Sequence, residues 1–326
     1  MIKGLGLPYM GSKRKLAGKI VDFIQRENPS VRYFYDLFGG GGAVSFEAVQ
    51  HSQFEHVVYN ELNTGIVNLL RKIWVVGVTD EFYDWVSRDE FEMHKNDDDW
   101  KGGLIKSIWS FGSNQAGYIF GRDIEEEKRL GFEWCVNNDK KALDSLLSKV
   151  GVNVNTAIFN ADNRSLRRRK FVSVFKKIKQ ESCSEQIDLF KRLLITKDVD
   201  RASLINLETL ERLETLERLD SLREIKRLKH KIKLEFINKS YNDVVINTPV
   251  NETVIYIDPP YANTAGYQLQ VDYEELLNYV LTSPYKIYVS SYELKGLKQV
   301  AAFKHKSILS ATNNNKIVEE CLFVRI

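Results

Sequence analysis

The chain has 326 residues, of which 43% are hydrophobic and 28% are charged, which is typical of a soluble globular protein with a large core. Its three cysteines lie far apart, which argues against a disulfide scaffold or a zinc site and for a reducing compartment. The net charge of +3 is too small to indicate a partner, and the first 19 residues hold no apolar run long enough for a signal peptide or a membrane span. We therefore expect a cytoplasmic protein without a membrane partner.

The first predicted element is a helix that begins after Ser12 and holds Leu16 on its apolar face. Serine is a frequent N-cap residue because its hydroxyl accepts a hydrogen bond from a free backbone N–H. Residues 9–13 also form a Tyr-x-Gly-x-Lys pattern. By themselves, Tyr9 could be a core residue and Lys13 a surface lysine.

A strand, a glycine turn and a helix are predicted in succession over residues 31–50. Residues 31–38 are rich in aromatic and β-branched side chains, residues 39–42 are all glycine, and residues 43–50 have a helical composition. Glycine permits positive φ and a close approach of the backbone to a ligand, so this context favours a nucleotide site. The glycine spacing differs from that of dinucleotide-binding and phosphate-binding loops.

An acidic residue follows at the end of the next predicted strand. Residues 56–60 are predicted as this strand, and Glu61 comes directly after it. A carboxylate about 20 residues past the glycine turn is suited to bind both ribose hydroxyls of a nucleoside. The alternative is an acid that stabilises the start of the helix predicted over residues 63–74 through the helix dipole.

Residues 80–235 are mostly polar and predicted to be helical. A loop bracketed by Gly112 and Gly121 carries side chains suited to base edges, because Asn and Gln pair well with adenine. The candidates in this loop are Asn114, Gln115 and Tyr118. A structural turn is the alternative.

Residues 164–179 form a basic block without a single acid before Gln180. Such a block is a candidate surface for DNA phosphates, with a solvated basic face as the alternative. The main candidates are Arg164, Arg167, Arg168, Arg169 and Lys170.

Leucine recurs at every third position from residue 204 to residue 222. On a straight α-helix this spacing rotates the apolar stripe by about 60° per step, so the leucines cannot all face one partner. The segment is therefore a helix buried on several sides, a helix that bends, or a low-complexity stretch.

A buried strand predicted over residues 254–257 leads directly into Asp258-Pro259-Pro260-Tyr261. Two consecutive prolines cannot continue a central strand, so a carboxylate, a stiff turn and an aromatic ring follow one another where the strand ends. Ligands bind at that end of the strands in open α/β sheets. The carboxylate and a turn carbonyl can accept hydrogen bonds from an exocyclic amine, and the ring can stack on its base. A plain Asp-Pro turn is the alternative.

Four segments, in this order, resemble motifs of the DNA adenine methylase (Dam-like) family of N6-adenine-specific DNA methyltransferases: residues 9–13, 38–42, 60–63 and 258–261. Residues 289–293 and 319–324 are also similar to that family. The resemblance implies an α/β fold with a Rossmann-like sheet that binds S-adenosylmethionine (AdoMet) and an inserted, mostly helical target-recognition domain. It assigns residues 1–75 and 236–326 to the catalytic domain and residues 76–235 to the insertion.

The resemblance also implies roles for individual residues. The AdoMet-binding residues would be Tyr9, Lys13, Phe38, Gly40, Gly42, Glu61, Ser240 and Asp258. The catalytic residues would be Asp258, Pro259, Pro260 and Tyr261, with Tyr261 stacked on a flipped base. The chain departs from the family at Ser240, where an acid is frequent, although a hydroxyl can still bind the adenine amine of AdoMet. Glu61 stands where Asp is more usual.

The implied reaction transfers a methyl group from AdoMet to N6 of adenine in double-stranded DNA, leaves S-adenosyl-L-homocysteine, and uses no metal. Two alternatives remain open: N4-cytosine methylation of DNA, and a non-catalytic module that binds AdoMet or another nucleotide. Asp rather than Ser at the first position of the 258–261 motif favours adenine. We expect a monomer in the cytoplasm of a bacterial or phage-infected cell.

Overall fold

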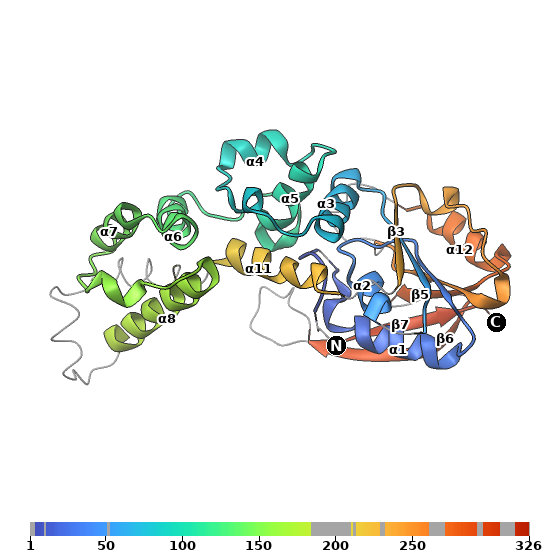
Figure 1. Cartoon of the computed structure of the whole chain (residues 1–326). Helices are drawn as coiled ribbons and strands as arrows, with labels where there is room; N and C mark the ends of the chain where they lie inside the picture. Colours follow the sequence, from blue (N-terminus) through green and yellow to red (C-terminus); the bar gives the residue numbers. More distant parts are fainter. Residues whose placement is uncertain are drawn as a thin grey trace. The chain divides into compact units, whose positions relative to one another are not determined.

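The computed structural model describes residues 4–9, 11–50, 53–183, 210, 213–228, 232–260, 271–291, 296–306 and 317–325 (Figure 1). The chain divides into two compact units. The sheet unit comprises Met1–Val78, Met93–Gly117 and Ser221–Ile326, and the helical unit comprises Thr79–Glu92 and Tyr118–Asp220. The predicted limits of the insertion, residues 76–235, remain a prediction.

A seven-stranded sheet forms the centre of the sheet unit, in the order β3-β2-β1-β4-β5-β7-β6. The strands are β1 Tyr33–Asp36, β2 His56–Asn60, β3 Lys233–Ile237, β4 Thr253–Ile257, β5 Lys286–Ser291, β6 Lys298–Lys306 and β7 Ile317–Val324. The first five run parallel, and β7 lies antiparallel between β5 and β6. The predicted Rossmann-like α/β fold is confirmed, and β2 has the bounds predicted from the sequence.

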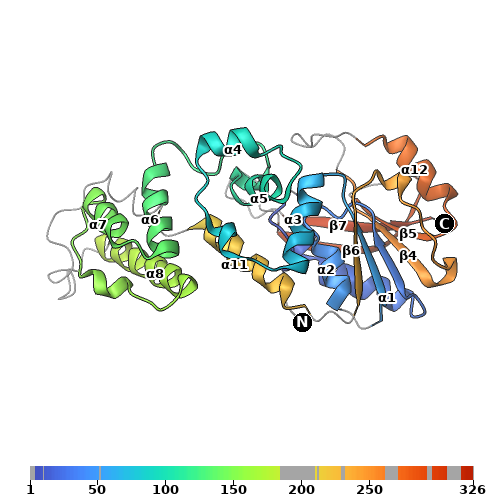
Figure 2. The ribbon, with the colours of Figure 1, turned by 45° about the horizontal axis from the view of Figure 1, so that its top comes forward.

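Helices cover both faces of this sheet. Helices α1 Ala17–Glu27, α2 Ala43–Gln50 and α3 Thr64–Val75 precede or connect the strands on the β1-to-β3 side, and α12 Tyr273–Thr282 connects β4 to β5. Right-handed crossovers that run in opposite directions from β1 and β4 place α2 and α3 on one face and α12 on the other. On the first face, α2 and α3 lie side by side (Figure 2), and Phe46 of α2 stacks on Trp74 of α3. On the second face, Leu276 of α12 packs with Ile255 and Ile287.

The first helical segment differs from its prediction. A 3-10 turn, η1 Lys13–Lys15, comes first, and α1 begins only at Ala17. Ser12 precedes η1 but its hydroxyl makes no capping hydrogen bond, so the predicted N-cap role of Ser12 is wrong. The turn directs the side chain of Lys13 inward, where it is buried.

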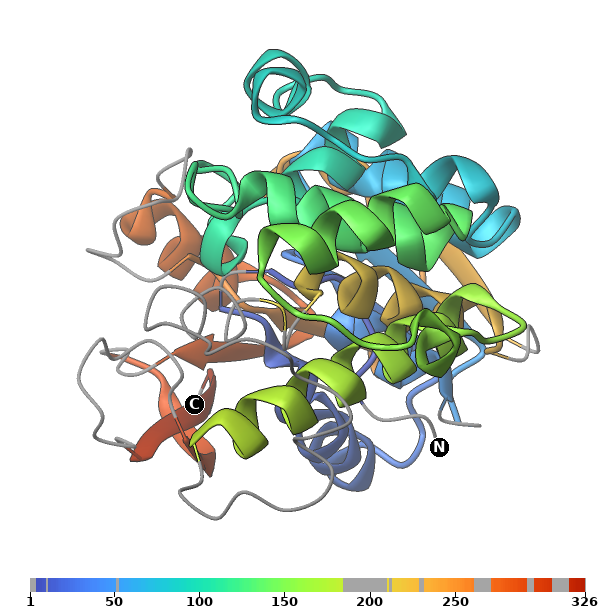
Figure 3. The ribbon, with the colours of Figure 1, turned by 90° about the vertical axis from the view of Figure 1, so that its left-hand side faces the viewer.

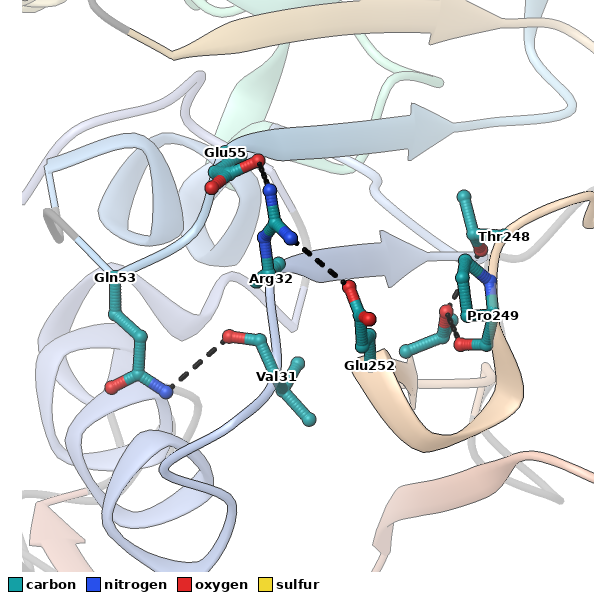
Figure 4. Close-up of polar contacts among 8 residues, drawn as sticks. Val31, Arg32, Gln53, Glu55, Thr248, Pro249 and Glu252 are labelled. Carbon is teal, nitrogen blue, oxygen red and sulfur yellow. Dashed lines mark hydrogen bonds and ion pairs between the residues drawn. The ribbon is translucent and has the colours of Figure 1, made fainter.

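The amino ends of the central strands are joined at Arg32 (Figure 4). Its guanidinium bonds Glu55, which precedes β2, and lies 3.4 Å from Glu252, which precedes β4. The Arg32 backbone N–H also donates to the Glu252 carbonyl at 2.9 Å. Because the guanidinium is about half exposed, these ion pairs contribute little energy, and the backbone bonds set the strand alignment.

The described residues between α3 and β3 form a largely helical segment. Its longer helices are α4 Arg88–His94, α5 Trp100–Ile108, α6 Glu125–Asn137, α7 Lys140–Lys149, α8 Arg164–Cys183 and α11 Glu214–Lys226. After η1, the described residues also form the 3-10 turns η2 Asp80–Tyr83, η3 Phe111–Ser113, η4 Thr156–Phe159, η5 Tyr241–Asp243 and η6 Val250–Glu252.

In the helical unit, α8 packs against α6 and η4 (Figure 3). Phe171 and Phe175, one helical turn apart on α8, meet at a ring-centroid distance of 4.6 Å and enclose Phe159 of η4. These rings and Trp134 of α6 are buried. The core of this unit is therefore aromatic.

The leucine repeat is helical where it is described. Leu216, Leu219 and Leu222 lie on α11 and are all buried, as are Leu210 and Leu213 before it. Positions three apart rotate around a helix, so the alternative of a helix buried on several sides is confirmed for this segment. Leu204 and Leu207 lie outside the described residues.

Arg167 has a structural role at the carboxyl end of α6. Its side chain is buried, and its guanidinium donates to the carbonyls of Cys135 at 3.0 Å and Val136 at 2.9 Å. These are carbonyls that a helix end leaves without internal partners. The sequence predicted a phosphate contact for Arg167. Its guanidinium instead points into the protein and stabilises the end of α6.

Arg167→Met should destabilise the protein by about 3 kcal/mol, because it leaves buried carbonyls without donors. Arg169→Met, two residues away and exposed, is the matched control and should change stability by less than about 0.5 kcal/mol. Urea unfolding of the full chain measures both. Equal midpoints for the two variants would contradict the structural role of Arg167.

Candidate active site

A cavity of about 420 Å³ opens at the carboxyl ends of β1 and β4. The chain leaves β1 towards β2 and leaves β4 towards β5, in opposite directions, so the connections diverge and leave a crevice between these strands. Most of its lining comes from five parts of the chain: Tyr9 with residues 11–13, residues 36–41 with 43–44, residues 61–63, residues 113–116, and Tyr256 with residues 258–260. Lys239, Ser240, Tyr241, Val271, Asp272 and Glu275 complete it.

The glycine turn after β1 forms one wall of the cavity. Gly42 has φ +79°, and a Cβ there would lie 2.7 Å from the ring of Phe46, so only glycine fits. The turn is fixed at Gly40, whose carbonyl accepts a hydrogen bond from the Tyr59 hydroxyl at 2.7 Å. The Gly40 N–H donates to Glu61 Oε2 at 2.9 Å.

Glu61 thus links the glycine turn to the end of β2. Its other oxygen, Oε1, accepts the Asn63 N–H at 2.9 Å. Burial raises the pKa of Glu61, while these backbone donors and the charge of Lys106 oppose the rise. The carboxylate is held at the cavity wall and still has acceptor positions for a ligand.

Lys106 of α5 lies behind Glu61. Its ammonium is 3.4 Å from Asn63 Oδ1, and burial lowers its pKa. It reaches this place because α5 packs very closely on α3: a Cβ at Gly103 would lie 2.0 Å from the Gly65 carbonyl oxygen. No sequence pattern indicates this lysine, because its position depends on how two helices pack.

Asp258 follows β4 directly and faces Lys13. The Lys13 ammonium lies 2.7 Å from Asp258 Oδ1 and 3.6 Å from Glu320 Oε2. Burial raises the pKa of Asp258 to about 6; the Lys13 charge opposes the rise and Glu320 adds to it. Ser290 donates to Glu320 Oε1 at 2.7 Å. One cation therefore lies between two carboxylates at the end of β4.

Asp36 is a third carboxylate at this edge of the sheet. The sequence motifs did not indicate it. Asp36 is the last residue of β1, just as Asp258 is the first residue after β4. Its Oδ2 accepts a hydrogen bond from the Ser45 hydroxyl at 2.7 Å. Its Oδ1 is buried and has no hydrogen-bond partner among the described residues. Burial raises the pKa of Asp36 to about 7, the Ser45 bond opposes the rise, and Asp258 and Glu61 add to it.

Two aromatic rings form a further part of the cavity wall. Phe38 stacks on Tyr241 with ring centroids 5.2 Å apart and an interplanar angle of 29°. Ser240 lies next to this pair and lines the cavity. The side chain of Asn60 donates to the carbonyls of Leu37 at 2.9 Å and Lys239 at 3.1 Å, which aligns the two segments.

The proline turn is held from α12. The hydroxyl of Tyr273 donates to the carbonyl oxygen of Pro260, and both prolines line the cavity. Tyr9 lies over the glycine turn, with its ring 3.3 Å from the place of a Gly40 Cβ. Tyr261 lies outside the described residues.

A comparison with protein families gives a match to the amino-terminal part of the chain. Residues 9–99 match the model of the D12 class N6 adenine-specific DNA methyltransferases. This part of the chain is similar to that family. A comparison with curated proteins gave no match.

The matched residues include the predicted motif segments 9–13, 38–42 and 60–63. The predicted resemblance to the DNA adenine methylases is confirmed over these residues, and the match indicates an adenine-specific DNA methyltransferase. Asp258 lies beyond the matched range, but the fold brings it to the cavity that the matched segments line. Among the described residues, no helix is long and apolar enough to cross a membrane.

Asn114 and Gln115, two of the predicted DNA contacts, line the cavity. They belong to a tight loop in which Ser113 has φ +59° and Gln115 has φ +61°. Asn114 Oδ1 accepts the backbone N–H groups of Ala116 at 2.9 Å and Gly117 at 3.2 Å. The Asn114 oxygen thus stabilises the loop, and Gln115 makes no such bond.

Tyr118, the third predicted DNA contact of this loop, is positioned differently from Asn114 and Gln115. The side chain is buried in the helical unit, and its hydroxyl donates to the Val86 carbonyl at 2.7 Å. The Arg88 guanidinium lies 4.8 Å from its ring centroid. The structure thus places this ring in a packed core, where it supports the fold.

The basic residues of α8 divide into two groups. Arg164 pairs with Asp80 at 2.9 Å, and Arg168 pairs with Asp220 at 3.1 Å. These acids compensate the charges of Arg164 and Arg168 within the helical unit. Backbone carbonyls likewise accept hydrogen bonds from the guanidinium of Arg167. Arg169 and Lys170 are exposed, although Lys170 also donates to the Asn160 carbonyl at 2.5 Å.

Asp36→Asn should raise the free energy of unfolding at pH 8 by up to about 4 kcal/mol, because it removes a buried charge whose pKa is raised to about 7. The raised pKa means that the folded protein loses stability as pH rises from about 4 to 7. The gain in the variant should therefore vanish near pH 4 and be complete above pH 7. Urea unfolding at several pH values measures it, with Asp22→Asn, an exposed carboxylate on α1, as the control. A gain independent of pH would contradict the assignment.

Proposed function

We propose that the protein transfers a methyl group from AdoMet to N6 of adenine within a short double-stranded DNA site. One observation carries the proposal. A single cavity brings together the glycine turn, Glu61 and the Asp258-Pro259-Pro260 segment, which are far apart in the sequence. A cofactor held by the first two would lie next to the group that binds the target amine.

The cavity has features that fit AdoMet. Glu61 would take the ribose hydroxyls, the Phe38 wall and Ser240 would bind the adenine, and the glycine turn would admit the methionine part together with Tyr9. The buried, unpartnered oxygen of Asp36 is suited to the α-ammonium group, which would offset its unfavourable burial. When bound, AdoMet supplies an electrophilic methyl group.

The residues of the chain prepare the amine that accepts this methyl group. The lone pair of adenine N6 is delocalised into the ring and is a poor nucleophile. Hydrogen bonds from N6 to the Asp258 carboxylate and the Pro259 carbonyl would favour a tetrahedral nitrogen and free the lone pair. N6 then gains a bond to carbon, the sulfur retains the electron pair of the broken bond, and N6 gives up a proton. The gain in rate comes from orientation and electrostatics.

The target base must leave the DNA stack to reach Asp258, at a cost of a few kcal/mol. Stacking on Tyr261 would recover about 1–3 kcal/mol. The Tyr273 hydrogen bond to Pro260 would keep the proline turn, and so the Pro259 carbonyl, in place. The product formed from AdoMet would be S-adenosyl-L-homocysteine. A monomer suffices for these steps.

For DNA, we propose that the insertion is the target-recognition domain and that α8 contributes phosphate contacts. The buried face of α8 holds Phe171 and Phe175, and the exposed face holds Arg169, Lys176 and Lys177. Lys170 extends this exposed positive charge. Gln115 is the remaining candidate for a contact with a base edge, because its amide makes no bond within its loop.

Asp258→Ala should lower methyl transfer by at least about 100-fold, the scale for loss of a group that acts in the transition state. AdoMet binding should largely survive, because Lys13 keeps Glu320 as a partner. Transfer of tritium from labelled AdoMet to DNA measures the rate, and calorimetry measures binding. Near-normal transfer by the variant would exclude the proposed role, and N4-methylcytosine in the digested product would exclude adenine as the target.

Replacement of Arg169 and Lys170 by Gln should weaken DNA binding and reduce the slope of log K against log salt by up to about 2. The matched control replaces Lys140 and Lys141, exposed lysines of α7 in the same unit, so the net charge changes equally. Binding titrations over a range of salt concentrations give the slopes. If both pairs change the slope alike, the effect comes from net charge and α8 is not the contact surface.

A further inference from the structure

Glu320 is a buried acid that the proposed reaction leaves without a role. Only 3% of its side chain is exposed, and its Oε2 lies 3.6 Å from the Lys13 ammonium. Its Oε1 accepts the Ser290 hydroxyl at 2.7 Å. A buried carboxylate is unfavourable unless its partners are well placed, so a position beside the catalytic carboxylate calls for an explanation.

The reversed strand β7 brings this acid to the active edge. The parallel register pairs Ile257 with Val289, so Ser290 on β5 lies level with Asp258. Because β7 runs antiparallel to β5, with Ser291 opposite Cys321, Glu320 lies next to the carboxyl end of β5. An acid from the middle of β7 therefore meets groups at the ends of the parallel strands.

The cluster has one cation for two carboxylates. If Lys13 were paired with Asp258 alone, the ammonium would neutralise the carboxylate that must accept hydrogen bonds from the target amine. With Glu320 on its other side, Lys13 is shared between two acids, and the group of three keeps a net negative charge. That charge favours the positive charge that develops on N6 as it gains the methyl group.

We propose that Glu320 is a positioning residue for methyl transfer: it shares Lys13 with Asp258 and so keeps the Asp258 carboxylate basic enough to bind adenine N6 and accept its proton. The inference rests on the proposed function of Asp258. In the step concerned, the N6 lone pair forms the bond to the methyl carbon, the carbon–sulfur electron pair stays on sulfur, and one N6 proton moves to Asp258 and then to water.

Among the described residues, Lys13 of η1 and Glu320 of β7 act on the charge of Asp258, which in turn acts on Asp36 of β1 and Tyr256 of β4. Lys13 lowers the pKa of Asp258 and Glu320 raises it. Removal of the Glu320 charge should therefore make Asp258 more acidic, both directly and because Lys13 would then pair with Asp258 alone.

The test compares Glu320→Gln with Glu319→Gln, which removes the same charge from the exposed neighbour on β7. Carbon NMR of carboxyl-labelled aspartate in the protein without AdoMet or DNA gives the titration midpoint of Asp258, assigned with Asp258→Asn. We expect Glu320→Gln to lower this midpoint by about one pH unit and Glu319→Gln to leave it unchanged. Glu320→Asp keeps the charge but withdraws it, so its shift should be smaller and in the same direction, and it serves if the Gln variant does not fold.

The pH profile of kcat/KM for methyl transfer gives the second measurement. In Glu320→Gln the acid limb should move to lower pH, and the plateau should fall by up to about tenfold, since one pKa unit of basicity sets that limit. An unchanged Asp258 midpoint overturns this inference whatever the activity. A shifted midpoint with an unchanged rate profile would instead remove Asp258 from the chemistry and overturn the proposed function.

Discussion

The reversal of strand order between β1 and β4 is the constraint on which the rest of this structure depends. Right-handed crossovers diverge from these two neighbouring strands, so the space beyond their carboxyl ends is not covered by a helix. The glycine turn follows β1 into this space, and Asp258 follows β4. The pairing of β1 with β4 brings these two segments together, as the proposed transfer between a donor and an acceptor amine would require.

The site is built at a cost in stability. Asp36, Glu61 and Asp258 line one cavity, Glu320 lies behind it, and burial raises the pKa of the first three. Lys13 and Lys106 compensate this negative charge only in part. A cavity with an excess of buried carboxylates favours a cationic ligand, which agrees with the sulfonium and ammonium charges of the proposed cofactor.

The basic segment on α8 of the helical unit divides into a buried and an exposed part. Arg164, Arg167 and Arg168 make ion pairs or hydrogen bonds that hold helices together. Arg169 and Lys170 lie on the exposed side of the same helix. Because successive residues on an α-helix point in directions about 100° apart, a run of arginines must divide between core and solvent. Only the exposed part is free to contact DNA phosphates.

The sequence by itself determined the elements and the chemistry of the two strand ends. Runs of apolar and β-branched residues, ended by glycines or prolines, predicted β2, the glycine turn, α2 and the Asp258 segment, because these depend on neighbours in the chain. The tertiary structure alone decided which charges meet. Glu320 reaches Lys13 through the reversed direction of β7, Lys106 reaches Asn63 through the contact of α5 with α3, and Arg167 turns inward to α6. Such pairings depend on strand direction and helix packing, which no local pattern of residues records.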